Sequence, residues 1–560
     1  MKRVLLSLCA VILCFGGSLA QTDYSDLQRL AQRVAALEKA YPQYVKTQAL
    51  AKTQGGSDIW LLTIGAGATE QKPALAVIGG VDGKHLLGVE LAIGFAENLL
   101  AHAQQDSVRK LLETQAFYVF PNMSPDATEQ YFAGLQYERS GNARPTDDDR
   151  DGQANEDGYE DLDGDGKITT IRVLDPTGNF LPNPDEPRSM IKADAAKGHV
   201  GQYLVFSEGI DNDKDGQFNE DGEGGVHFNK NSTYNYKNFQ PGGGEHAVSE
   251  VENRALFDFL YDAFNVYAVL SFGPHNNLST PEQAGRNAVP AATPGQSFRT
   301  GGRRLTDWSA QDANVSALVS EQYNKITGTK DAPKTVAGHG DFVEWAYYHY
   351  GRFSFGTPGW WVPKPGTDAA RGGAERGAEG TIDDPVANYL QWATSKGITN
   401  TFADWKPIQH VDFPDKQVEV GGLHPFVLHN PPYDFVGDVV AAHTDFVVAL
   451  AHQAPRIDLV NVRTEKVDNQ LTRITLQVFN TGHLPTLTAP GEQSYFLKHI
   501  AVKVSTSGNQ SVVSGRPAQT IGQIPGRGYH ELSWLIQGTG SVTIEAGSPH
   551  TGSKSVNVSL

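Results

Sequence analysis

The sequence predicts an α/β protein with a doubly wound, mixed and mostly parallel sheet, followed by a small all-β sandwich. Short apolar segments typical of buried strands alternate with longer segments of helical periodicity as far as residue 453. After Pro455 the pattern changes to short alternating runs separated by Gly, Asn and Pro. Strands that alternate with helices form sheets covered on both faces, whereas short alternating strands form sandwiches.

The first region contains several expected strands and helices. Leu27, Leu30 and Val34 recur at helical spacing near the start of this region. Residues 266–272 form an apolar run, as expected of a strand that is buried on both faces. The expected strands span 59–64, 74–78, 117–120 and 266–272, and the expected helices span 26–44, 86–102, 250–264, 310–326 and 435–452.

The second region reads as a sandwich of about 100 residues. Its expected strands are 457–462, 471–480, 495–505, 510–514, 528–536 and 541–546. The predicted organisation is a signal peptide over 1–20, an α/β domain over 21–455 and a sandwich domain over 456–560. Two long insertions in the α/β domain, 140–225 and 280–305, are expected to be irregular loops, which in compact domains tend to be functional or ordered by a ligand.

The N-terminus has the composition of a secretory signal peptide. Basic residues at positions 2 and 3 precede an apolar stretch, and small residues precede a cleavage position after Ala20. The apolar stretch is too short to span a bilayer, and no later segment is long enough. We therefore expect a secreted or periplasmic protein without a membrane span. Both cysteines, Cys9 and Cys14, fall within the signal, so the mature chain has no disulfide and no cysteine ligand.

The charge balance limits the classes of partner. The chain has 46 Lys and Arg against 64 Asp and Glu, a formal net charge of -18. Such a balance argues against nucleic acid or an anionic membrane surface. The sequence leaves the oligomeric state open.

Three acidic loops have the pattern Asp-x-Asp-x-Asp-Gly, which predicts calcium binding. Alternating carboxylates can converge on one hard cation, and the glycine permits the sharp turn. The second loop resembles an EF-hand loop, except that Arg172 stands at position twelve in place of a bidentate Glu. We expect the bound ions to have a structural role. The candidate ligands are Asp147, Asp149, Asp151, Glu156 and Asp157 in the first loop, Asp161, Asp163 and Asp165 in the second, and Asp211, Asp213, Asp215, Asn219, Glu220 and Asp221 in the third.

A series of motifs resembles the zinc carboxypeptidase family (carboxypeptidase A-like metallopeptidases) over roughly residues 24–453. The segment Ile78-Gly79-Gly80-Val81-Asp82-Gly83-Lys84-His85 resembles the first zinc-ligand turn. The further matches occur in the family's order, at 121–126, 226–231, 249–250, 269–272, 338–345 and 354–358. The resemblance implies a mixed, mostly parallel sheet with the site at its carboxyl edge. It also implies zinc held by a His-x-x-Glu turn and a second His, with a separate Glu as general base.

The family's ligand and catalytic positions are substituted in this chain. The first His is Asp82 and the Glu is His85, and both of these residues can bind zinc. The second His position falls on Gly273 and the general-base position falls on Gly359, and glycine has no side chain for either task. General-base action contributes at least about 10²–10⁴-fold to the rate. The resemblance therefore implies that a chain without this base and without the third zinc ligand has no ordinary peptidase activity.

Three hypotheses follow for the function. The favoured one is a pseudoenzyme that binds a peptide or peptide-like ligand through its carboxylate, held by Asn229, Lys230 and the oxyanion candidate Arg139, without cutting it. The second is an active metallocarboxypeptidase acting on peptides or cell-wall peptides, with zinc rearranged onto Asp82, His85 and His275 and with Glu344 as a base. The third is a calcium-stabilised adhesion or structural module.

Overall fold

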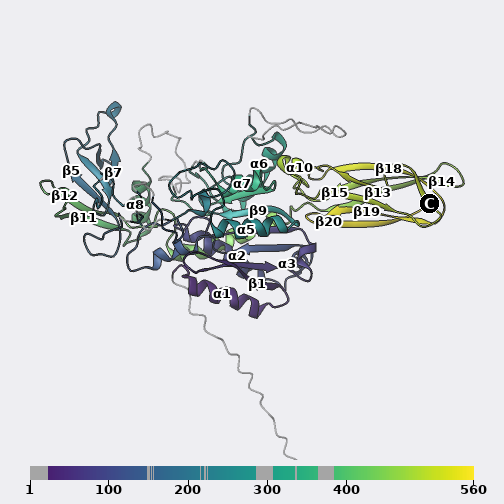
Figure 1. Cartoon of the computed structure of the whole chain (residues 1–560), viewed down its shortest axis with the longest axis horizontal. Coiled ribbons are helices and arrows are strands. Elements are labelled where there is room, and N and C mark those ends of the chain that lie inside the picture. Colours follow the sequence, from purple (N-terminus) through teal and green to yellow (C-terminus); the bar gives the residue numbers. More distant parts are fainter. Residues whose placement is uncertain are drawn as a thin grey trace, which may run out of the picture.

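The computed structural model describes residues 23–147, 152, 154–155, 157–214, 216–219, 222, 225–285, 307–333, 337–363 and 384–560. The described residues form a central α/β body with a small antiparallel sheet on one side and an elongated sandwich on the other (Figure 1). The predicted signal peptide lies outside the described residues, as do six of the calcium candidates: Asp149, Asp151, Glu156, Asp215, Glu220 and Asp221.

The central sheet has six strands in the order β1-β2-β4-β3-β9-β10. The strands β4, β3, β9 and β10 are parallel, whereas β1 and β2 pair antiparallel at one side. The bounds are β1 Val45–Lys52, β2 Asp58–Ile64, β3 Ala74–Ile78, β4 Ala116–Phe120, β9 Val266–Phe272 and β10 Phe353–Thr357. Every residue of β3, β4, β9 and β10 is buried, which explains the almost wholly apolar sequences of β3, β4 and β9.

Helices cover both faces of this sheet, which confirms the doubly wound α/β prediction. One apolar cluster joins the sheet to α1 (Leu27–Ala40), α2 (Leu86–Ala101), α6 (Ala310–Thr327) and α9 (Val436–Ala451). The cluster on the other face joins it to α5 (Val251–Asp262) and α7 (Phe342–Tyr348). The remaining helices are α3 Asp106–Thr114, α4 Pro125–Thr128, α8 Pro385–Lys396 and α10 Ala489–Gln493. No single helix in the described part is long and apolar enough to cross a membrane. The helices α2 and α3 together have the length and apolar composition of a span, but they are bent by 116° relative to each other.

The prediction that 140–225 is an irregular loop is wrong for much of this segment. It contributes four strands to a second sheet, in the order β11-β12-β5-β8-β6-β7, whose pairs are all antiparallel. The bounds are β5 Thr170–Leu174, β6 Phe180–Asn183, β7 Glu186–Lys192, β8 Tyr203–Ser207, β11 Phe402–Ile408 and β12 Val418–Leu423. Of these strands, β5 pairs with β12 more than 200 residues away, whereas β6, β7 and β8 pair within the segment itself. Most of the second insertion, 280–305, lies outside the described residues.

The C-terminal region is a sandwich of two four-stranded antiparallel sheets, β13-β14-β18-β16 and β17-β15-β19-β20. Its apolar core includes the fully buried Ile474, Trp534 and Ile544. The bounds are β13 Ile457–Lys466, β14 Leu471–Asn480, β15 Ile500–Ser505, β16 Ser511–Ser514, β17 Ala518–Ile521, β18 Tyr529–Gln537, β19 Ser541–Ser548 and β20 Gly552–Ser559. The expected strand over 495–505 begins only at Ile500, because Phe496 packs against Tyr261 and Lys498 lies over the Phe264 ring in the α/β domain.

Candidate functional site

The candidate site lies at the carboxyl edge of the central sheet, where three parallel strands end. Asp82 and His85 follow β3, Gly273 follows β9 and Gly359 follows β10. The Gly273 amide donates to the Thr357 carbonyl over 3.0 Å, so the ends of β9 and β10 are joined here. A Cβ built on Gly273 would lie 2.0 Å from Cγ2 of Val81, the residue before Asp82. The structure therefore brings the turn at 82–85 and the strand end at 273 together.

Neither glycine position has room for a side chain as the structure stands. Real Cβ atoms do not approach another heavy atom to 2.0 Å, so the Val81 methyl group occupies the space that a side chain at 273 would need. Gly359 has a φ of +74°, which disfavours any residue with a Cβ, and that Cβ would lie 2.4 Å from Cδ1 of Leu91. The surrounding residues are therefore packed around the glycines.

Asp82 interacts with two histidines at this edge. Burial opposes its ionisation, but Lys84 and a 2.8 Å hydrogen bond from the Ser140 hydroxyl outweigh burial and hold the pKa of Asp82 below its usual value. His85 and His227 lie close enough to favour the carboxylate further. We call Asp82, His85, His227 and the neighbouring His429 the carboxyl-edge cluster.

The histidines of this cluster are neutral. Burial and the neighbouring His429 lower the pKa of His85 to about 4, against weaker opposing effects of Asp82 and the Pro358 carbonyl. Burial and Lys230 lower the pKa of His227 to about 4 as well. His85 is 4% exposed, and neither of its ring nitrogens makes a well-formed hydrogen bond to another described residue, although the Pro358 carbonyl lies near the ring. Buried polar atoms are usually hydrogen-bonded, so the ring has hydrogen-bonding capacity to spare.

Comparisons with known proteins identify the family of the α/β domain. The sequence model of the zinc carboxypeptidase family matches residues 30–357, which is more than half of the chain. The chain belongs to the zinc carboxypeptidase family. Residues 456–559 match a second family, described as a domain of unknown function (DUF8731). The zinc carboxypeptidase match ends before Gly359, so it does not align the general-base position.

The relatives of this zinc carboxypeptidase homologue are distant. Carboxypeptidase D of Drosophila melanogaster is 28% identical over 112 residues, 19% of this chain and 8% of that protein, so the match spans a small part of that relative's length. Among solved structures, thrombin activatable fibrinolysis inhibitor has a TM-score of 0.39 at 10% identity and covers 77% of this chain and 74% of its own. Carboxypeptidase A from Helicoverpa armigera has a TM-score of 0.36 at 12% identity, and the match covers 60% of this chain and 64% of that chain.

The carboxyl-edge cluster does not fit the three-ligand zinc site that the family implies. Asp82 and His85 carry suitable donor atoms, but the third position is Gly273 and the space beside it is filled by Val81. Among the described residues, the only three His or acidic side chains with donor atoms within 4.8 Å of one another are elsewhere, in the acidic loops. The cluster thus lacks a converging set of donors.

His275, the candidate replacement ligand, is committed to other partners. Its Nδ1 lies 3.1 Å from Asp341 and its Nε2 lies 3.6 Å from Glu282. Burial opposes protonation, but these two carboxylates outweigh it and raise the pKa of His275 to about 10. An imidazolium has no free lone pair for a metal. In this arrangement both ring nitrogens of His275 face carboxylates, so His275 is held by Asp341 and Glu282.

The three residues expected to hold a ligand's carboxylate make hydrogen bonds to different parts of the chain. Asn229 donates to Asp341 and accepts from the Phe342 amide, and so holds the start of α7. Arg139 donates to the Gly141 and Asn142 carbonyls, and Lys230 donates to the Pro241 carbonyl. The charge of Lys230 acts on His227 of the carboxyl-edge cluster.

Lys84 is the cation that the sequence analysis missed. Its charge favours the carboxylate form of Asp82 and opposes protonation of the three histidines of the carboxyl-edge cluster. It is 3.7 Å from Glu138, and its side chain remains 32% exposed. Its position in the turn Asp82-Gly83-Lys84-His85, between the two candidate zinc ligands, could have indicated a cation at this site.

Glu344, the other residue considered as a base, gives a prediction about pH. Burial and the nearby carboxylates of Asp341 and Glu282 raise the pKa of Glu344 from 4.5 to about 7, and the opposing effect of His275 is smaller. Tyr234 and Tyr348 also face Glu344, and both stay neutral. The folded chain therefore binds a proton more tightly than the unfolded chain, and stability falls as pH rises from about 4.5 to about 7. We expect Glu344→Gln to raise stability at pH 8 by about 1 kcal/mol, after discounting for partial exposure, and to leave it unchanged at pH 4.

Thermal unfolding of both proteins at pH 4 and pH 8 checks this expectation. Glu321→Gln, on the exposed surface of α6, removes the same charge and serves as the control. An equal gain from both substitutions would show that the effect comes from net charge alone.

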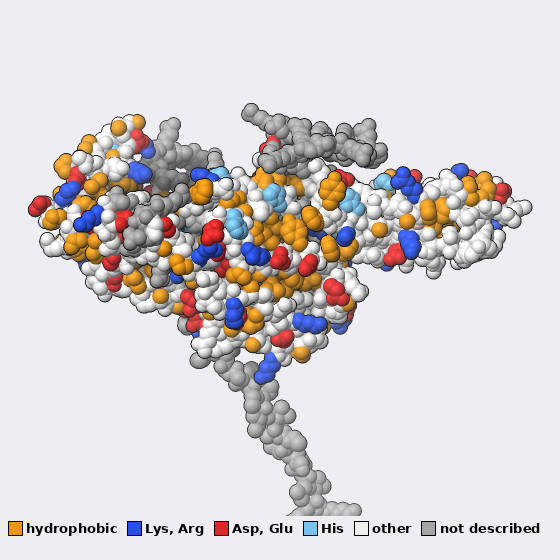
Figure 2. Space-filling model, in the orientation of Figure 1, with side chains coloured by type: hydrophobic (Ala, Val, Ile, Leu, Met, Phe, Trp, Pro, Cys, Tyr) orange, Lys and Arg blue, Asp and Glu red, His pale blue; other side chains and the backbone are white. Residues whose placement is uncertain are grey.

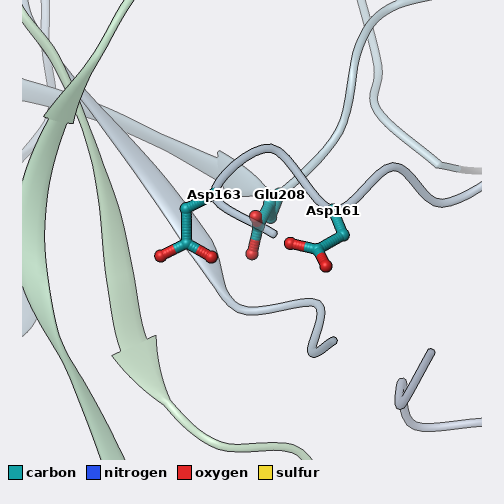
Figure 3. Close-up of side chains that lie close together, drawn as sticks. All are labelled: Asp161, Asp163 and Glu208. Carbon is teal, nitrogen blue, oxygen red and sulfur yellow. The ribbon is translucent and has the colours of Figure 1, made fainter. Parts of the chain in front are cut away.

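The acidic loops contain a compact group of carboxylates. Oxygen atoms of Asp161, Asp163 and Glu208 all lie within 4.8 Å of one another, and Glu208 lies between the two aspartates in Figure 3. Glu208 follows β8, whose last residue, Ser207, pairs with Thr170 of β5. A carboxylate from the neighbouring strand thus reaches the loop in which Arg172 replaces the expected Glu. The sequence analysis missed Glu208 because only strand pairing brings it there.

The other described calcium candidates hold their loops through backbone hydrogen bonds. Asp147 accepts from the Gly152 amide and Asp211 from the Gly216 amide, each over 3.1 Å. Each has a second carboxylate oxygen that is buried and accepts no hydrogen bond from the part of the chain that the structure describes. Asp157 accepts from Asn212 and from the Asn219 amide, and so joins the first loop to the third. Of the rest, Asp165 accepts from the Lys167 amide, and Asp213 is a described residue of the third loop. Calcium binding stays a prediction.

Proposed function

We propose that this zinc carboxypeptidase homologue binds a peptide-like ligand at the carboxyl edge of its sheet without hydrolysing it. The observation that carries this proposal is the Val81 methyl group beside Gly273, where the family's third zinc ligand would need its side chain. Without that ligand, the family's route through a zinc-bound water has no support in this chain. We keep the prediction that the protein acts outside the cytoplasm, because residues 1–20 have the composition of a signal peptide.

The charges around the carboxyl-edge cluster favour an anionic ligand. Lys84 and Lys230 both act on His227, so two ammonium groups lie near one neutral imidazole. Neutral imidazoles donate or accept hydrogen bonds, and ammonium groups attract a carboxylate as point charges. A peptide with a free C-terminal carboxylate fits this arrangement.

Peptide-binding and cleavage assays on the mature chain test the proposal. We expect a fluorescent peptide with a free C-terminus to bind about tenfold more tightly than its C-terminal amide, since a charge-assisted hydrogen bond contributes about 1.5–3 kcal/mol. Lys84→Met should remove this preference, whereas Lys503→Met, at an exposed position of β15, should retain it. Chromatography after prolonged incubation should show both peptides intact.

Two results would contradict the proposal separately. Cleavage of the free peptide that is lost in Asp82→Ala would show a working catalytic site. Equal binding of the acid and the amide would show that no carboxylate is recognised.

We also propose that Asp161, Asp163 and Glu208 hold a calcium ion with a structural role. Glu208 is fully buried and accepts hydrogen bonds from Leu162 and Thr169, but its ionised form faces two further carboxylates. Burial raises the pKa of Glu208, which reflects the cost of charging it there. A hard cation would offset that repulsion, and carboxylate oxygens are the ligands that calcium prefers.

A further inference from the structure

A groove of about 920 Å³ runs between the α/β domain and the start of the sandwich domain. The α/β domain contributes the segment 233–236, the end of α5 and the end of α7, and the sandwich domain contributes α10 with the three residues that follow it. Hydrophobic side chains gather in the middle of the face shown in Figure 2, over α5 and α7. The volume lies within the range of sites that bind small molecules or chain segments.

Aromatic rings line the groove. Tyr234 and Tyr348 stack at 4.3 Å with an angle of 8° between their planes. Tyr261 packs against Phe496 at 5.7 Å, which ties the two domains together at this point. Tyr495 is fully exposed and Phe496 is 67% exposed, so their rings are open to solvent. Exposed aromatic rings around a groove usually mark a binding surface.

The groove has few ionisable side chains. No Lys, Arg, Asp or Glu is among the described residues that line it, and the lining His349 lies with Nδ1 2.8 Å from the Thr233 hydroxyl. Burial raises the pKa of the Tyr234 and Tyr348 phenols, so both remain protonated donors at neutral pH. The side-chain amides of Asn235 and Gln493 make no hydrogen bond to other described residues, and each offers both a donor and an acceptor.

We propose that this groove binds an uncharged oligosaccharide. The apolar C–H face of a sugar ring packs flat against an aromatic ring, and its hydroxyl groups pair with amides and phenols. A ligand without formal charge matches a lining that contains no Lys, Arg, Asp or Glu, because an unpaired charge would be costly to desolvate there. An acidic polysaccharide would find no Lys or Arg among the described lining residues. The inference does not depend on the function proposed for the carboxyl edge.

Binding of defined oligosaccharides to the full mature chain tests the inference. We would titrate cellohexaose, xylohexaose, mannohexaose and chitohexaose, with the acidic hexamer of galacturonate as the charged counterpart, and follow binding by calorimetry. We expect at least one neutral hexamer to bind and the acidic hexamer not to bind. Tyr495→Ala should weaken binding about tenfold, the effect of losing one aromatic contact. Tyr529→Ala, an exposed tyrosine of β18 that is 58% exposed and outside the groove, should leave binding unchanged.

Tyr495 makes no packing contact that folding needs, because it is fully exposed, so its variant remains informative. Failure of all four neutral hexamers to bind would overturn the inference, as would tighter binding of the acidic hexamer. Equal binding by wild type and Tyr495→Ala would place the sugar elsewhere and overturn it as well. A dimer in solution that Tyr495→Ala dissociates would show that a second copy of this chain occupies the groove instead.

Discussion

Gly273→His is expected to destabilise the chain by about 3 kcal/mol rather than restore the family's zinc ligand. The new Cβ would lie 2.0 Å from Cγ2 of Val81, and both residues are enclosed by the ends of β3, β9 and β10. Overpacking of a dense core typically costs about 1–3 kcal/mol, and an imidazole adds more atoms than a Cβ alone. Thermal and denaturant unfolding of the variant against wild type measure the loss.

The double variant Val81→Ala with Gly273→His separates steric conflict from other causes. Without Cγ2 of Val81, the nearest atom to a Cβ at position 273 would be Cβ of residue 81. That distance is 3.5 Å, which is an ordinary packing distance. We therefore expect Gly273→His to cost much less in the Val81→Ala background than in wild type, a non-additive result typical of residues in contact. Equal costs in both backgrounds would show that Val81 does not fill the third-ligand position.

Calcium is expected to stabilise the chain by about 3 kcal/mol at concentrations near 100 times its dissociation constant. The free energy comes from binding to the folded acidic loops, where Asp161, Asp163 and Glu208 already lie together. Chelation should lower the temperature of unfolding, and added calcium should restore it. Glu208→Gln should remove most of this response, because a neutral amide replaces the fully buried carboxylate.

Asp415→Asn is the matched control for the calcium response. Asp415 is an exposed acid between β11 and β12, in the same part of the molecule, and its substitution changes the net charge equally. We expect its calcium response to equal that of wild type. A full response in Glu208→Gln would show that this carboxylate is not a ligand, and calcium would then have to act elsewhere.

The sequence could predict the central sheet because its strands are short, apolar and flanked by helices. The runs 74–78 and 266–272 are the observed strands β3 and β9, and α2 and α9 lie within a residue or two of expectation. The second sheet could not be predicted in this way. Its β5 and β12 lie more than 240 residues apart, and both depend on pairing that local pattern does not encode.

The candidate site could be predicted only in part for the same reason. Aligned motifs placed Asp82 and Gly273 at one sheet edge, and the structure brings these segments together. The motifs could not show that Val81 fills the space beside Gly273, or that His275 is held by Asp341 and Glu282. Strand pairing brings Glu208 to the second acidic loop, and no spacing along the chain indicated this.

Metal analysis of the purified mature chain tests the central claim most directly. The chain should be incubated with excess zinc, freed of unbound metal, and its zinc content measured per chain by mass spectrometry. The filled third-ligand position predicts far less than one zinc per chain, with no difference between wild type and His85→Ala. One zinc per chain in wild type that is lost in His85→Ala would contradict the account, because it would show a working metal site at the carboxyl edge.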